Sequence, residues 1–166
     1  MKLEVMIDMT NNLLINKGVA DIRKVPSPVK IMDIKGNRVI GCLDTPTWVD
    51  YSGVCNGRSI IFDAKETKIE RFPLKNIRDH QYELLKSWNR SGAYAFLLVA
   101  FWLGANEPEA YILPFRVLEK AWDGMMTGGR KSIPIKQFRE ECIKVKSANG
   151  YPLDYISAIK EEIKCQ

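Results

Sequence analysis

Five apolar residues near the start of the chain recur with the period of a helix: Leu3, Met6, Ile7, Leu13 and Leu14. We therefore predict a helix over residues 3–16, and Gly18 supplies its stop. Residues 19–25 can then form a strand, which Pro26 and Pro28 end or place at the edge of a sheet. The first segment of the chain is thus predicted to be a helix followed by a short strand.

The next pattern is that of a β-hairpin. Residues 29–42 read VKIMDIKGNRVIGC, with two β-rich arms around the dipeptide Gly36-Asn37. A Gly-Asn loop of two residues is typical of a type I′ or II′ turn, so Lys35 and Arg38 flank the tip. Proline-bearing segments precede and follow the hairpin, which indicates that it projects from the body of the protein.

The rest of the chain alternates strand and helix patterns. In order these are a strand at 59–65, a helix at 74–90, strands at 93–103 and 110–113, a helix at 115–124, a basic segment at 130–138 and a helix at 153–163. Residues 93–103, AYAFLLVAFWL, are apolar on both faces, which is typical of a central strand covered on both sides. The order predicts an α/β fold with a mixed sheet flanked by helices, in a single domain spanning 1–166.

Composition sets limits on this picture. The chain has 166 residues, of which 46% are hydrophobic and 27% charged, as in an ordinary globular protein. Neither a signal peptide nor a membrane span is predicted. The cysteines Cys42, Cys55, Cys142 and Cys165 and the single histidine, His80, form no zinc or disulfide motif, so we expect reduced thiols in a cytoplasmic protein. The net charge of +5 and the pI near 9.0 favour polyanions only weakly.

Candidate chemistry lies around a second turn, in the stretch DYSGVCNGRSIIFDAKET. Asn56-Gly57 between two β-rich runs is a strong hairpin signal, and a two-residue loop there places Asp50 directly opposite Asp63. Lys65 follows two residues later and therefore lies on the same face of its strand as Asp63. Because like charges directly opposite each other are destabilising, a compensating cation is expected.

Two carboxylates and an ammonium suit phosphodiester hydrolysis. Mg²⁺ is commonly held by one or two carboxylates, and it polarises phosphate and helps to generate hydroxide, while Lys65 can orient water or offset developing charge. Gln81 falls on the apolar stripe of the following helix, at i+4 from Ile77, where it can reach the metal or serve as a satisfied structural amide. His80 beside it is either catalytic or structural. The spacing alone leaves open that these are surface charges on a hairpin.

The two aspartates and the lysine match the PD-(D/E)xK nuclease pattern, without the usual proline immediately before the first acid. Further stretches resemble the RecU family of Holliday junction resolvases, also called penicillin-binding protein-related factor A: LEVMIDMTN, RKVPSPVKI, DYSGV, FDAKET, FPLKNIRDHQ, YILPF and RKSI. The resemblance runs from the first predicted helix to the last. It implies a restriction-endonuclease-like fold and a homodimeric endonuclease, dependent on Mg²⁺ or Mn²⁺, that nicks four-way DNA junctions symmetrically.

The resemblance also implies roles for individual residues. By motif position, Asp50, Asp63 and Gln81 take the places of the metal site, and Lys65 takes that of the transition-state stabiliser. Glu4, in the N-terminal helix motif, is a further candidate for positioning the metal or its water.

The hairpin at 29–42 corresponds to the family's stalk, which enters the centre of the junction. DNA contacts are expected from five basic residues: Lys35, Arg38, Arg71, Lys75 and Arg78. The expected partners are four-way junction DNA and a second copy of the chain, together with a recombinase or a branch-migration helicase.

Two positions depart from the family pattern. Val49 stands where the family usually has threonine, and Asp63 stands where it usually has glutamate, so the metal preference or the rate can differ. The stalk is also shorter, which bears on junction selectivity. Two other functions therefore stay open: a less selective PD-(D/E)xK endonuclease acting on flaps or duplex, and a non-catalytic junction-binding protein that modulates recombination.

Overall fold

The computed structural model describes residues 2–104 and 107–164, with side chains up to residue 160. In chain order the elements are α1 (Lys2–Asn16), β1 (Asp21–Lys24), β2 (Val29–Lys35), β3 (Arg38–Leu43), β4 (Tyr51–Cys55), β5 (Arg58–Thr67), β6 (Arg71–Pro73), the 3₁₀ helix η1 (Leu74–Asn76), α2 (Asp79–Arg90), β7 (Tyr94–Phe101), β8 (Glu109–Pro114), α3 (Phe115–Met126), β9 (Ser132–Pro134), α4 (Ile135–Glu141), β10 (Ile143–Val145) and α5 (Tyr155–Lys164). None of the helices in these ranges is both long and apolar enough to cross a membrane.

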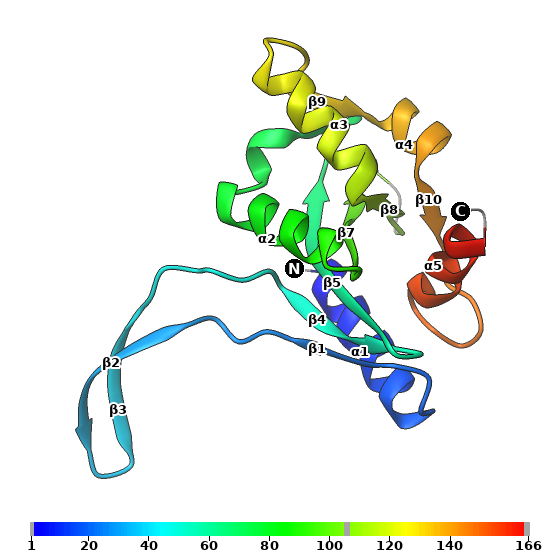
Figure 1. Ribbon diagram of the computed structural model, residues 1–166. Coiled ribbons are helices and arrows are strands. Elements are labelled where there is room, and N and C mark those ends of the chain that lie inside the picture. The colour runs from blue at the N-terminus through cyan, green and yellow to red at the C-terminus, as the bar shows by residue number, and fades with distance from the viewer. Residues whose placement is uncertain (1, 105–106, 165–166) are drawn as a thin grey trace.

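A six-stranded mixed sheet forms the centre of the molecule, in the order β1-β4-β5-β7-β8-β10 (Figure 1). Strands β5 and β7 are parallel, and every other neighbouring pair in this sheet is antiparallel. Between the two parallel strands the chain passes through β6, η1 and α2. This crossover brings α2 onto the sheet, where it contacts β5 and β7.

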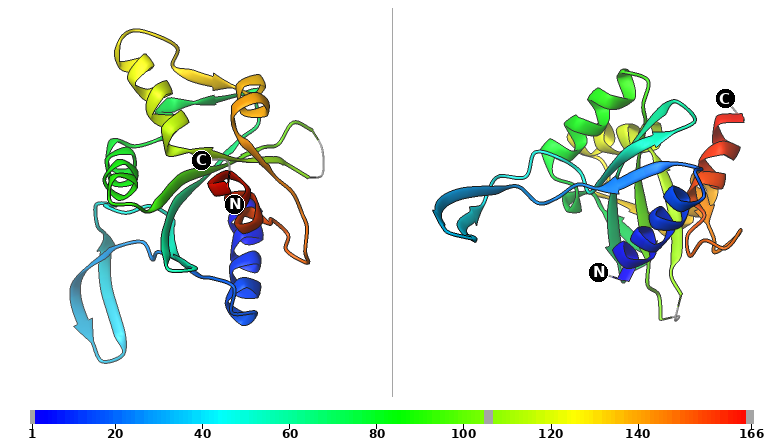
Figure 2. Two further views of the ribbon diagram at one scale, coloured as in Figure 1. Left: turned by 45° about the vertical axis from the view of Figure 1, so that its right-hand side comes forward. Right: turned by 90° about the horizontal axis from the view of Figure 1, so that it is seen from below.

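Helices cover both faces of the sheet (Figure 2). On one face α1 and α5 pack through residues such as Leu3, Ile7 and Ile156. On the other face α2, α3 and α4 pack through residues such as Leu85 and Leu118. Strand β7 is buried at every position, as its apolar run predicts for a strand covered on both sides. The expected α/β architecture, a mixed sheet flanked by helices, is confirmed.

Successive residues of β5 face opposite layers of the molecule. Phe62 and Ala64 belong to the core beneath α1 and α5, and Ile61 belongs to the core beneath α2. Because side chains alternate along a strand, Asp63 and Lys65 share the face of Ile61. The strand therefore presents Asp63 and Lys65 to α2, whereas Glu66 faces α1 and its Oε1 accepts from the N–H group of Leu3 at 2.6 Å.

The hairpin of β2 and β3 extends away from the body of the protein (Figures 1 and 2). The two strands pair antiparallel with Lys35 opposite Arg38, and every residue of both strands is exposed. The predicted projecting hairpin at 29–42 is therefore confirmed.

Both hairpin turns have the backbone conformation that their sequences favour. In the projecting hairpin Gly36 has a φ of +58°, as the first of the two central positions of a type II′ turn requires. In the β4–β5 hairpin Asn56 and Gly57 have φ values of +50° and +76°, as in a type I′ turn. The Asn56-Gly57 turn fixes the register of β4 and β5 along their whole pairing, whereas in the projecting hairpin the register shifts by one residue between Ile31 and Asp33.

The predicted helix at 74–90 is wrong in its first part. Leu74–Asn76 form the 3₁₀ helix η1. The N–H group of Ile77 donates to the carbonyl of Leu74 at 3.0 Å and closes this turn. Ile77 and Arg78 are extended, and α2 starts one residue later. The cause is tertiary, because β6 pairs with β9 and the N–H group of Leu74 donates to the carbonyl of Lys131 at 3.0 Å. These bonds to a distant segment prevent one continuous helix.

Four short elements are not predicted by the sequence pattern: β6, β9, α4 and β10. Each of these strands has three residues and α4 has seven, which is too short for a periodic signal. One of them, β10, completes the sheet by pairing with β8. The cysteines Cys42, Cys55 and Cys142 are free thiols, and Cys165 lies outside the described residues.

Candidate active site

The aspartates of the DYSGV and FDAKET stretches lie next to each other. The β4–β5 register is the one that the Asn-Gly turn predicts, with Tyr51 paired to Phe62. Asp50 precedes Tyr51, and its N–H group donates to Oδ1 of Asp63 at 3.2 Å. In return the N–H group of Ala64 donates to Oδ2 of Asp50 at 3.0 Å. The structure thus brings the two aspartates together, and each carboxylate is anchored to the backbone beside the other.

Lys65 and Gln81 complete a cluster around Asp63. Nζ of Lys65 lies 2.6 Å from Oδ2 of Asp63 and donates to Oε1 of Gln81 at 3.1 Å. Nε2 of Gln81 donates to Oδ1 of Asp63 at 2.9 Å, and Oε1 of Gln81 also accepts from the N–H group of Arg78 at 3.1 Å. Each oxygen of Asp63 therefore has its own close partner.

Gln81 reaches the site from the first turn of α2. Ile77 lies outside this helix, so the predicted i+4 relationship between Ile77 and Gln81 is wrong. Gln81 is buried for a different reason, because its side chain turns back to the N–H group of Arg78 and inward to Asp63. The amide thus closes the start of the helix and holds a carboxylate of the sheet.

Asp63 is completely buried. Burial raises its pKa to about 6, since the ionised carboxylate loses hydration; Lys65 opposes this rise and Asp50 adds to it. Nζ of Lys65, 2.6 Å from Oδ2, offsets part of the charge of the ionised carboxylate. A buried carboxyl group with a perturbed pKa and a specific charge partner is typical of functional sites.

Asp50 and Asp63 are the residues that fit a cation. With Lys65 they leave a formal charge of −1 when both are ionised, and carboxylate oxygens are ligands that Mg²⁺ prefers. Gln81 fits less well as arranged, because its oxygen already accepts from Lys65 and Arg78. Across the described ranges no group of three or more His, Cys, Asp or Glu side chains could hold a metal ion. A cation between two aspartates would therefore take its other ligands from water and phosphate.

Glu4 lies in α1, which packs on the opposite face of the sheet from α2. Its Oε2 accepts from Nζ of Lys24 in β1 at 2.7 Å, and in the part of the chain that the structure describes no hydrogen bond joins it to Asp50 or Asp63. The carbonyl of Asp50 accepts from the N–H group of Val25, next to Lys24, at 2.8 Å. No motif marks Lys24 in the sequence, because its partner lies 20 residues away.

The predicted DNA-contact residues are all exposed: Lys35, Arg38, Arg71, Lys75 and Arg78. Two lie at the hairpin tip, and three lie between the start of β6 and the N-cap of α2. For His80, Nε2 is buried without a partner among the described residues, and no hydrogen bond there joins it to the cluster. Val49 is buried in the core beneath α2, so this position offers packing in place of a hydroxyl group.

Comparisons with known proteins agree along nearly the whole chain. A family model described as recombination protein U matches residues 1–161. The Holliday junction resolvase RecU of Oenococcus oeni is 36% identical over 168 residues, which cover 97% of this chain and 84% of that protein. The Holliday junction resolvase RecU of Staphylococcus epidermidis is 34% identical over 170 residues, which cover 98% of this chain and 80% of that protein.

A solved structure, the Holliday junction resolvase Hjc of Archaeoglobus fulgidus, covers 81% of this chain and 92% of its own at 14% identity, with a TM-score of 0.48. The family model and the identity to curated relatives extend through the elements that carry the cluster. The chain belongs to the RecU family.

Proposed function

We propose that this protein is a Holliday junction resolvase, a metal-dependent endonuclease that nicks four-way DNA junctions symmetrically. The observation that carries the proposal is the cluster of Asp50, Asp63, Lys65 and Gln81, joined by contacts of 2.6 to 3.2 Å on one face of the sheet. It occurs in a chain of the RecU family, whose relatives are named Holliday junction resolvases.

Mg²⁺ or Mn²⁺ is the proposed cofactor. Asp50 and Asp63 would hold it, and Gln81 would add a third ligand only by exchanging one of the two hydrogen bonds that its oxygen now accepts. When bound, such an ion polarises the scissile phosphate and lowers the pKa of a water molecule. The charge of the two adjacent aspartates supports this assignment.

The residues of the chain provide the rest of the mechanism. The ammonium of Lys65, whose side chain is 17% exposed, offsets the negative charge that develops on the phosphate in the transition state. Gln81 orients Lys65 and Asp63 at once through its two amide atoms. Glu4, held by Lys24, is proposed to position attacking water. Because these side chains hold one another, little reorganisation is needed at the moment of reaction.

Substrate binding is assigned to the hairpin and to the basic segment before α2. Lys35 and Arg38 contact phosphates at the centre of the junction, and Arg71, Lys75 and Arg78 contact the DNA arm beside the site. The exposure of all five residues supports this proposal. Phosphate contacts of this kind dominate affinity and weaken with salt.

The proposed assembly is a homodimer of a single domain, residues 1–166, working in the cytoplasm. A four-way junction has approximate twofold symmetry, and a twofold dimer places two sites for cutting opposing strands. A recombinase or a branch-migration helicase is the proposed protein partner. The test of assembly is sedimentation of the protein alone and with a junction.

The function is tested with a labelled mobile four-way junction, a linear duplex and a flap, each incubated with protein and Mg²⁺. We expect paired symmetric nicks in the junction and no cutting of the duplex or the flap. The Asp63→Ala variant, or wild type without metal, should not nick the junction. Equal cutting of duplex or flap would show a less selective nuclease. Binding of the junction without any cutting would show a non-catalytic recombination protein.

A further inference from the structure

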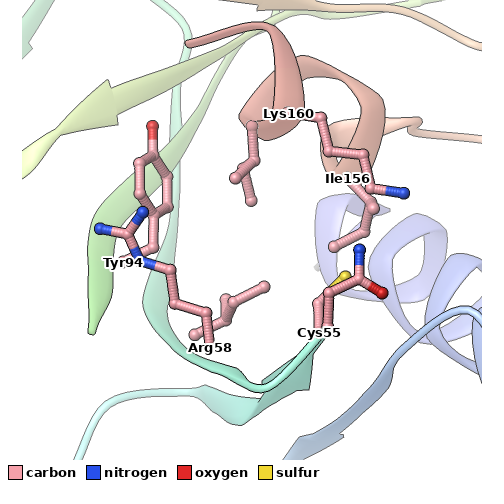
Figure 3. Close-up of a pocket in the computed structure, with 8 residues that line it drawn as sticks. Cys55, Arg58, Tyr94, Ile156 and Lys160 are labelled. Atoms are coloured by element: carbon pink, nitrogen blue, oxygen red, sulfur yellow. The ribbon is translucent and has the colours of Figure 1, made fainter. Parts of the chain in front are cut away.

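A hollow of about 270 Å³ lies beside Asp50, where the projecting hairpin joins the body of the protein. Its walls are residues 25–28 and 46–50, which belong to the two connections that lead into β2 and out of β3. The volume is just under the range of about 300–1,000 Å³ that is usual for ligand pockets, so the hollow has room for one small group. A separate pocket, which Tyr94, Cys55 and Lys160 border, lies on the far face of the sheet (Figure 3).

Trp48 forms one wall of the hollow beside Asp50. Among the aromatic residues of the chain, all of which the structure describes, Trp48 is the only exposed one, with 38% of its surface accessible. Its ring meets the ring of Trp88 in α2 nearly at right angles, with centres 5.5 Å apart, and the next residue, Val49, is buried in the core beneath α2. Such an aromatic pair adds to the stability of the contact. The indole is therefore held in place and yet accessible.

The hollow is continuous with the proposed metal site. Trp48 is two residues from Asp50, and both line the hollow. The carbonyl of Asp50 accepts from the N–H group of Val25 at 2.8 Å, so the two walls are joined beside this aspartate. A nucleotide whose phosphate lies at Asp50 and Asp63 therefore has its nucleobase within reach of Trp48.

The lining of the hollow favours a nucleobase over a phosphate. Asp50 is its only ionisable residue, and the other lining residues are apolar side chains, three prolines, a serine and a threonine. Without a lysine or arginine the hollow offers nothing to balance a phosphate charge. A nucleobase is uncharged and planar, and every nucleobase has a π face that can stack on an aromatic side chain.

We propose that Trp48 stacks on the nucleobase of a nucleotide beside the scissile phosphate, after that nucleobase has turned out of the helical stack at the branch point. This role rests on the proposed function, and it gives the site a reason to prefer a junction. Turning out a nucleobase costs least where pairing and stacking are already disturbed, as at a branch point, and most within a continuous duplex. Trp48 is thus a substrate-positioning residue that contributes to junction selectivity.

The test removes the nucleobase and the indole separately and then together. The substrates are an immobile, fluorescein-labelled four-way junction and copies of it that each carry one abasic residue, placed in turn at the nucleotides nearest the branch point in one strand. Fluorescence anisotropy measures their affinity for the full-length protein at one fixed salt concentration, with Ca²⁺ in place of Mg²⁺ to suppress cutting. Removal of a nucleobase also changes the junction itself, but this contribution cancels when two proteins are compared on the same pair of substrates.

Trp48→Leu removes the ring face and keeps an apolar side chain. At one position, the loss of affinity caused by the abasic residue should be about tenfold larger for wild type than for this variant. Trp48→Phe, which keeps a ring face, should retain most of this difference. Trp122→Leu in α3, which removes an indole that stacks on Tyr82 and does not line the hollow, should behave as wild type. Thermal denaturation checks that each variant folds.

Binding of linear duplex gives a second readout. A continuous duplex presents no nucleobase to Trp48, so Trp48→Leu should bind it as tightly as wild type does. A variant that only loosened the fold or the hairpin would lose affinity for duplex and junction alike.

Cutting of the intact junction by wild type in Mg²⁺ tests the proposed function separately, because the affinity comparison needs no cutting. If wild type binds the junction but never cuts it, the proposed function fails, and the affinities of Trp48→Leu still decide the stacking role. That role is overturned if loss of the indole and loss of the nucleobase weaken binding independently at every position, or if Trp48→Leu weakens duplex and junction binding equally. Failure of wild type to bind the junction would overturn both.

Discussion

Asp50 and Asp63 are held against each other by reciprocal bonds: the N–H group of Asp50 donates to Oδ1 of Asp63 at 3.2 Å, and the N–H group of Ala64 donates to Oδ2 of Asp50 at 3.0 Å. Hydrogen bonds from backbone donors stabilise the ionised carboxylates, and Lys65 supplies one positive charge. The two carboxylates are thereby kept close together in the folded protein.

Replacing Lys65 with methionine is expected to separate metal binding from cleavage. Removal of the ammonium changes the formal charge of the cluster from −1 to −2, so Mn²⁺ should bind several-fold more tightly in calorimetry. Junction cleavage should fall about 100-fold to 1,000-fold, because transition-state charge loses its partner. Lys120→Met is the matched control and should leave both the Mn²⁺ affinity and the cleavage rate unchanged. Full cleavage by Lys65→Met would contradict the site assignment.

Replacing Gln81 with methionine should destabilise the protein. The change removes the donor to Oδ1 of Asp63 and the acceptor for the N–H group of Arg78. Leaving such groups unsatisfied costs about 1–3 kcal/mol in the free energy of unfolding, measured by urea denaturation. Glu83→Met, at an exposed position of the same helix, should change this free energy by less than about 0.5 kcal/mol. If the two variants changed the free energy of unfolding equally, the hydrogen bonds of Gln81 would contribute nothing to stability.

The raised pKa of Asp63 predicts a pH dependence of stability in metal-free protein. Below pH 3.8 the group is protonated in both the folded and unfolded states, while between 3.8 and about 6 the folded protein keeps a proton that the unfolded chain releases. Stability should therefore fall as pH rises through this window. Relative to Asp63→Asn, which does not titrate, the free energy of unfolding of wild type should fall by about 2 kcal/mol between pH 4 and pH 7.5. A difference in the free energy of unfolding between wild type and Asp63→Asn that stays constant from pH 4 to pH 7.5 would contradict the raised pKa of Asp63.

Gly53 in the DYSGV stretch is expected to tolerate no side chain. A Cβ atom there would lie 2.1 Å from the carbonyl oxygen of Asp21 and 2.5 Å from Cα of Ile22, both in the paired strand β1. Gly53→Ala should destabilise the protein by about 1–3 kcal/mol and lower cleavage by displacing β4. Gly124→Ala, in α3 with open space around it, should instead stabilise by about 0.5–1 kcal/mol. Thermal denaturation of both variants checks the opposite signs.

The hairpin tip is expected to contribute to junction affinity through phosphates. Lys35 is 73% exposed on its side chain, and its 3.6 Å contact with Asp33 is a weak surface pair. Lys35→Ala combined with Arg38→Ala should weaken junction binding and reduce the slope of log affinity against log salt by about 2. Lys120→Ala should leave this slope unchanged. A double variant with the wild-type slope would remove the tip from the DNA interface.

Local chemistry accounts for the part of the site that was predicted correctly. The Asn56-Gly57 turn sets the register of the strands beside it, and side-chain alternation then places Lys65 on the face of Asp63. The break before α2 was not predictable in this way, because it depends on a hydrogen bond from Leu74 to Lys131, 57 residues later in the chain. The reason for the burial of Gln81 was not predictable either, because it depends on where α2 begins.

The sequence by itself determined the elements with long periodic patterns, the register of the β4–β5 hairpin and, through its motifs, the family. These depend on interactions within a few residues, which propensity, alternation and turn geometry describe. Only the tertiary structure decided that Glu4 pairs with Lys24, that Gln81 closes the cluster from the start of α2, and that Tyr94 borders a pocket on the far face. Each of these contacts joins segments far apart in the chain, and burial across the whole fold selects them.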